Sequence, residues 1–159
     1  MRTLLAAAIA LTPLAAAADL TVTFRDGAPK DRFTLSYDGA CALSDLTVQI
    51  DLGTAPAGLI FDTTGAGAGV EVFQPLEWVT GVARTSAVTD GDTSLTLALD
   101  TLAPGETLAF TIDIDDTTST RQITVDGSEM AGATLRVDGA AALFDATGTA
   151  RAATVACTS

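Results

Sequence analysis

Two stretches in which apolar residues occupy every second position give the clearest structural signal in the chain. Leucine alternates with polar or small residues from Leu95 to Leu99. After a turn at Pro104, bulky apolar residues again fill alternate positions as far as Ile114. In a β-strand this period places the apolar side chains on one face. Residues 93–116 are therefore predicted to form an antiparallel hairpin with one buried and one solvated face.

Similar short apolar runs recur along the rest of the chain, separated by turn-forming residues. Asp-Gly pairs begin at residues 26, 38, 90, 126 and 138, between apolar runs, where they favour turns with positive φ. No segment combines a sustained helical period with capping residues at both ends. Closely spaced strands without helices predict an all-β fold, an immunoglobulin-like β-sandwich of two antiparallel sheets. No repeat or change of composition divides residues 19–159, so these are predicted to form a single domain.

The first 18 residues have the layout of a secretory signal peptide. Arg2 supplies a positive charge, residues 4–14 form an apolar run, and the small residues Ala16, Ala17 and Ala18 precede Asp19. The apolar run is too short, and too interrupted by Pro13, to span a bilayer. We therefore expect residues 1–18 to be removed. The rest of the chain is predicted to be secreted, in the extracellular medium or the periplasm, and not membrane-spanning.

The chain contains two cysteines, Cys41 and Cys157. In an exported protein an even pair is first interpreted as a disulfide. A Cys41–Cys157 bond is therefore predicted, and a pair of reduced thiols is the alternative.

Charge and composition restrict the classes of function. The 159 residues include 20 Asp and Glu against 8 Lys and Arg, and no histidine. Such an acidic surface repels phosphate backbones, so nucleic acid is not expected as a partner. Without histidine the chain has no Ser-His or Cys-His catalytic pair and no imidazole metal site. A non-enzymatic function is expected, although a carboxylate pair of the kind that hydrolyses glycosidic bonds stays open.

The densest group of acidic residues lies at the end of the second predicted hairpin strand. Asp113 and Asp115 are two residues apart, so their carboxylates are expected on one face, roughly 6.5–7 Å apart. Asp116 follows directly, and Asp62, which ends another apolar run, is the predicted fourth member. Carboxylate oxygens are the hard ligands that Ca²⁺ takes in proteins. The four residues are predicted to bind Ca²⁺; the alternative is a solvated acidic face whose like charges discourage edge pairing.

Aromatic residues are scarce, and Trp78 is the single tryptophan. Two interpretations apply to it. The first is a core residue, as a lone tryptophan usually is in a sandwich, and the second is a platform that stacks on a sugar ring.

Three segments carry a resemblance to a known family: residues 58–75, which are rich in glycine, residues 110–117, which are acidic, and residues 123–133. They resemble small exported proteins of marine alphaproteobacteria called aggregation factor core proteins, a name taken from sponge cell-adhesion proteoglycans. The resemblance covers residues 19–159 and implies Ca²⁺-dependent adhesion. Residues 102–110 are also similar to the turn and strand of bacterial immunoglobulin-like adhesion modules.

These observations lead to one main expectation and two alternatives. The main expectation is an exported adhesion or aggregation module, assisted by Ca²⁺, that binds extracellular polysaccharide or a cell-surface protein. The first alternative is a hydrolase that cleaves polysaccharide with a carboxylate pair. The second is a structural partner of another envelope protein.

Overall fold

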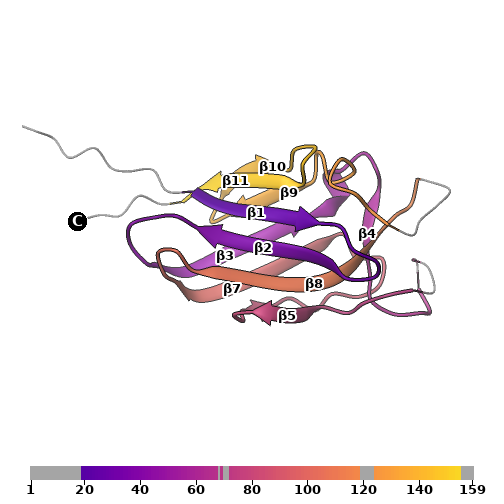
Figure 1. The fold of residues 1–159 in the computed structure, drawn as a ribbon, viewed down its shortest axis with the longest axis horizontal. Helices are drawn as coiled ribbons and strands as arrows, with labels where there is room; N and C mark the ends of the chain where they lie inside the picture. Colours follow the sequence, from indigo (N-terminus) through magenta and orange to yellow (C-terminus); the bar gives the residue numbers. More distant parts are fainter. Residues whose placement is uncertain (1–18, 68, 70–71, 119–123, 155–159) are drawn as a thin grey trace, which may run out of the picture.

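The computed structural model describes residues 19–67, 69, 72–118 and 124–154. These residues confirm the predicted all-β fold, in which two antiparallel sheets pack face to face (Figure 1). Within these ranges no helix has the length and hydropathy that crossing a membrane requires. The predicted signal peptide, residues 1–18, lies outside the described residues. Cys157 does too, so the Cys41–Cys157 bond stays a prediction.

The first sheet forms the layer nearer the viewer in Figure 1. It contains β1 (Asp19–Arg25), β2 (Asp31–Tyr37), β4 (Leu59–Asp62), β5 (Glu77–Thr80), β8 (Thr107–Asp116) and β11 (Thr149–Ala153). Its strand order is β11-β1-β2-β8, and β4 and β5 follow one another along the remaining edge of β8.

The second sheet packs behind the first. It contains β3 (Leu43–Asp51), β6 (Arg84–Thr85), β7 (Ser94–Leu102), β9 (Thr134–Val137) and β10 (Ala140–Leu143), in the order β10-β9-β3-β7-β6. A short 3₁₀-helix, Leu52–Thr54, follows β3, and the side chain of Asp51 caps it by accepting from the N–H of Gly53.

The hairpin predicted for residues 93–116 is wrong in its pairing, although both strands form. Strand β7 pairs with β3 and β6, whereas β8 pairs with β2, β4 and β5. The connection at Pro104 therefore crosses from one sheet to the other. It is held against β2, because the Gly105 N–H donates to the Tyr37 carbonyl (3.0 Å). Period-two alternation directs apolar side chains to the core, but it does not distinguish strands that share a sheet from strands that face each other.

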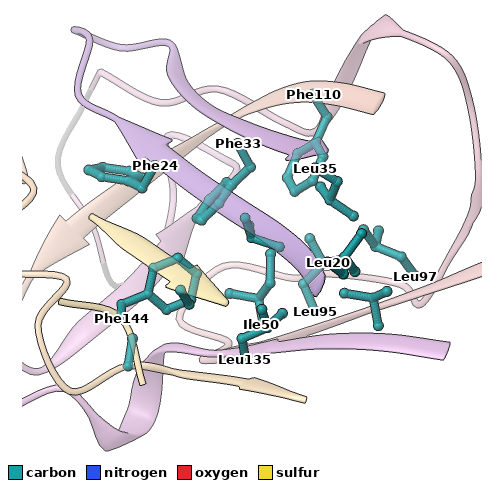
Figure 2. Close-up of a cluster of buried hydrophobic side chains, with 14 of the residues drawn as sticks. Leu20, Phe24, Phe33, Leu35, Ile50, Leu95, Leu97, Phe110, Leu135 and Phe144 are labelled. Carbon is teal, nitrogen blue, oxygen red and sulfur yellow. The ribbon is translucent and has the colours of Figure 1, made fainter. Parts of the chain in front are cut away.

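Aromatic side chains of the first sheet pack on one another along the core. The ring centroids of Phe24 and Phe33 are 5.4 Å apart, and those of Phe33 and Phe110 are 5.2 Å apart with nearly parallel planes. Aliphatic side chains of the second sheet, such as Leu95, join the same cluster (Figure 2). Trp78 on β5 is partly buried and lies edge-on to Phe110, with centroids 5.5 Å apart, so its ring packs against the core.

The Asp-Gly pairs form two kinds of turn. Asp138 and Gly139 have φ of 45° and 95° and join β9 to β10 as a two-residue hairpin, in which Val137 pairs with Ala140. The prediction of positive φ is confirmed at residues 91 and 139 and wrong at residues 27, 39 and 127. At Asp126 the reason is visible. Its carboxylate accepts from the N–H groups of Ser128 and Glu129 and so caps a helical turn.

Candidate metal centre

The end of β8 pairs with β4 so that three carboxylates share one face of the first sheet. In the register of these strands, Asp62 lies opposite Asp113, and Ile60 lies opposite Asp115. Residues that pair directly, and residues two apart on one strand, point to the same face. One oxygen from each of Asp62, Asp113 and Asp115 lies within 4.8 Å of the other two. The structure therefore brings together three of the four predicted ligands.

These three side chains are buried, with exposed fractions of 0% for Asp62, 5% for Asp113 and 2% for Asp115. The solvated face predicted for this strand is wrong at its end. The chain leaves the edge of β8 after Asp62 and rejoins it at Gln74, where the Asp113 N–H donates to the Gln74 carbonyl (3.0 Å). Between these points Gly69 lies against the carboxylates of Asp62 and Asp115. A residue distant from β8 in the sequence, Gly69, thus lies over its acidic face.

Asp62 lacks a hydrogen-bond donor. Both of its carboxylate oxygens are buried without a partner. The side chains that interact with it are the carboxylates of Asp90 and Asp115. Two carboxylates contain no donor unless one of them holds a proton, so these contacts are repulsive while all the groups are charged. Because an unpaired buried charge is costly, the arrangement favours the uptake of a cation or of protons.

Burial raises two pKa values at the site. Burial raises the pKa of Asp62 to about 7, and the carboxylates of Asp90 and Asp115 act in the same direction. The pKa of Asp113 is also raised to about 7, mainly by burial and then by the charge of Asp115. A hydrogen bond with the backbone of Ile114 acts in the opposite direction and lowers it. In the metal-free protein both groups therefore bind protons near neutral pH, and a cation that binds there has to displace them.

Asp116, the remaining predicted ligand, lies on the opposite face of β8. It pairs with Leu59 rather than with a residue of the carboxylate group. One of its carboxylate oxygens accepts from the Thr118 N–H at 3.2 Å, two residues further along the chain. The structure therefore does not bring Asp116 to the other three, since adjacent residues of a strand point to opposite faces.

Asp90 is a fourth acidic residue near the carboxylates, and sequence reasoning missed it. Its Oδ1 accepts from the N–H groups of Thr63 (2.9 Å) and Thr64 (3.2 Å), which follow Asp62. The only signal for Asp90 in the sequence is its place in an Asp-Gly turn. That signal predicts a turn but not what the side chain contacts.

Asp31, at the start of β2, is a second acidic residue that the sequence does not single out. Its side chain is 1% exposed, and its two oxygens accept from the N–H groups of Gly27 (2.9 Å) and Ile114 (3.0 Å). Burial raises the pKa of Asp31 to about 8, although both hydrogen bonds lower it. Asp31 thus links the turn before β2 to β8 at the residue between Asp113 and Asp115.

Comparisons with known proteins identify no relative. No family matches the chain, and searches of curated proteins and of solved structures found no similar protein. The candidate function therefore rests on the geometry of the site and on the character of the sequence.

Proposed function

We propose that the chain is an exported, non-enzymatic adhesion or aggregation module whose fold is stabilised by Ca²⁺ bound between Asp62, Asp113 and Asp115. The observation that carries the proposal is the pair of buried oxygens on Asp62, which have no donor and lie beside two other carboxylates. A divalent cation converts this repulsion into attraction, because each carboxylate gains a positive partner in a water-poor environment.

The donor set favours Ca²⁺ over Mg²⁺. Carboxylate oxygens from Asp62, Asp113 and Asp115 are the hard ligands that both ions take. Calcium takes six to eight such oxygens in flexible geometry, whereas magnesium requires near-ideal octahedral geometry and usually keeps several waters. Three carboxylates that the fold holds in a buried position therefore suit the more flexible geometry of calcium better.

The burial of the three side chains also bears on how the ion supports adhesion. With exposed fractions of 5% or less, these carboxylates are not arranged to hold an ion that faces a sugar or another protein directly. In the proposed function the ion acts inside the module. It fixes the end of β8 and the segment that covers it, and polysaccharide or a cell-surface protein binds elsewhere on the surface.

Thermal unfolding in EDTA, in millimolar Ca²⁺ and in Mg²⁺ at equal ionic strength tests the metal site. At tenfold excess over the dissociation constant, Ca²⁺ is expected to add about 1.4 kcal/mol of stability, which corresponds to a few degrees in Tm. Asp62→Asn should abolish this shift, because it removes a ligand charge. Its Tm in EDTA should be no lower than that of the native chain, because the repulsion is relieved.

Asp116→Asn is the matched control for this experiment. It removes the same charge from the same end of the sheet, but on the face away from the three carboxylates, and it should keep the calcium shift. If Ca²⁺ stabilises the native chain no more than Mg²⁺, or if Asp62→Asn keeps the shift, the metal site is refuted.

Binding is separated from catalysis by incubating the protein with a panel of marine polysaccharides. We expect calcium-dependent retention on at least one polymer or on whole cells, and no release of reducing ends. Release that disappears when a single acidic residue is changed to its amide would favour the hydrolase instead.

A further inference from the structure

The chain segment that precedes β7 places Asp90 beside Asp62. Oδ1 of Asp90 accepts from the N–H groups of Thr63 at 2.9 Å and Thr64 at 3.2 Å, the two residues that follow Asp62. The carboxylates of Asp62 and Asp90 also interact directly. Asp90 therefore contacts both a proposed ligand and the backbone that carries it.

The turn that carries Asp90 is itself fixed in position. The Gly91 N–H donates to the Phe61 carbonyl (2.9 Å), and the Phe61 N–H donates to the Asp92 carbonyl (2.8 Å). Within the turn, Thr89 donates from its N–H (2.7 Å) and its hydroxyl (2.8 Å) to the carboxylate of Asp92. This backbone pairing with the last residues of β4 sets the position of Asp90 independently of any ion.

Two glycines pack against the acidic side chains from the covering segment. A Cβ atom on Gly67 would overlap the carboxylate of Asp90. A Cβ atom on Gly69 would overlap the carboxylate of Asp62 and lie 2.6 Å from Oδ2 of Asp115. The backbone thus approaches the carboxylates where any side chain would be excluded, as it does in sites where main-chain groups approach a ligand.

We infer that Asp90 is a positioning residue of the cation site, which holds Asp62 and the start of the glycine-rich segment in the arrangement that binds the ion. This inference rests on the proposed function. Under it, the ion connects three parts of the chain: residues 62–67 with Gly69, the turn at residues 89–92, and residues 113–115. Because the turn continues into β7, cation binding also tightens the connection between the two sheets at this end of the sandwich.

Titration of the purified full chain with Tb³⁺, followed by its luminescence, tests the inference together with Tm measured in EDTA. Asp90→Asn keeps a carbonyl oxygen for the N–H groups of Thr63 and Thr64, but it replaces the charge beside Asp62 with an NH₂ group, which donates to the Asp62 carboxylate and turns it away from the ion. Loss of a residue that orients a ligand typically weakens metal affinity 10- to 100-fold. We expect Asp90→Asn to raise the Tb³⁺ dissociation constant at least about tenfold while its Tm in EDTA stays equal or rises.

Asp92→Asn is the matched control, because it removes the same charge from the same turn while its side-chain carbonyl still accepts from Thr89 and keeps the turn in place. Its Tb³⁺ dissociation constant should stay within about twofold of the native value. The inference is overturned if Asp90→Asn binds Tb³⁺ as the control does, or if its affinity and its Tm in EDTA fall together, as expected of a purely structural side chain. Failure of the proposed function is distinct, because the native chain would then not bind Tb³⁺, or would bind it unchanged after Asp62→Asn.

Discussion

Asp31 makes the stability of the fold depend on pH in a direction opposite to that of most carboxylates. Its pKa is raised from 3.8 to about 8 in the folded protein, with burial as the main cause. Between these two values the folded state holds a proton that the unfolded state has released. The contribution of Asp31 to stability is therefore complete below pH 3.8 and is lost as the pH rises toward 8.

The size of the effect follows from the linkage relation. Where the folded state alone holds one proton, the free energy of unfolding falls by about 1.4 kcal/mol for each unit by which the pH rises. Over pH 5 to 8 the loss amounts to about 3–4 kcal/mol, since it levels off close to the folded pKa. That is a large part of the stability of an ordinary domain.

Asp31→Asn isolates this contribution. The amide cannot accept from both Gly27 and Ile114, because one end of it is an NH₂ group that faces a backbone N–H. At pH 5 the variant should be less stable than the native chain by about 1–3 kcal/mol, the cost of an unsatisfied buried donor. The difference should shrink as the pH rises, and the two stability curves should cross before pH 8.

Urea unfolding of both chains in EDTA, at intervals from pH 5 to 8, measures the difference directly. Titrating groups that do not interact with Asp31 are common to both chains and cancel. Asp45→Asn, at an exposed acid of β3 that does not act on the pKa of Asp31, should run parallel to the native chain. A difference between the native chain and Asp31→Asn that stays constant over this range would refute the reasoning, because Asp31 would then not titrate there.

Two further predictions concern the core and the processing of the chain. Phe110→Ala should lower the free energy of unfolding in urea by about 3–5 kcal/mol, because the ring is fully buried between Phe33 and Trp78. Leu143→Ala, at a side chain 64% exposed, should lower it by less than about 0.5 kcal/mol. Similar losses in the two variants would contradict the core assignment. Intact-mass measurement of protein from the native compartment should show cleavage between Ala18 and Asp19 and a Cys41–Cys157 bond, and a mature mass with two alkylatable thiols would rule the bond out.

The sequence predicts those parts of the fold and site that depend on strand periodicity. Alternation from Leu108 to Ile114 predicts the core face of β8, and the same period places Asp113 and Asp115 together on the other face. Asp62 is a further predicted ligand because it ends an apolar run. In the structure this run is β4, which pairs with the acidic end of β8.

The remaining features depend on contacts between distant segments, which periodicity does not encode. Asp115 is buried where Gly69, which is far from it in the sequence, lies against its carboxylate. Asp90 reaches the site from a turn 27 residues beyond Thr63. The two strands on either side of Pro104 have the alternation of a hairpin, and only their choice of partners shows that they belong to different sheets.

The pairing of β1 with β11 has a consequence for how the chain folds. Asp19 is in register with Ala153, so the first strand of the domain cannot complete its sheet until the last strand has been synthesised. The pairs β2–β8 and β3–β9 also join strands far apart in the sequence. Folds dominated by such contacts fold on the millisecond-to-second timescale, because long loops have to close before the strands can pair. The first sheet therefore cannot be completed during synthesis, and under the export proposed above the chain would still lack this sheet when it reaches the export channel.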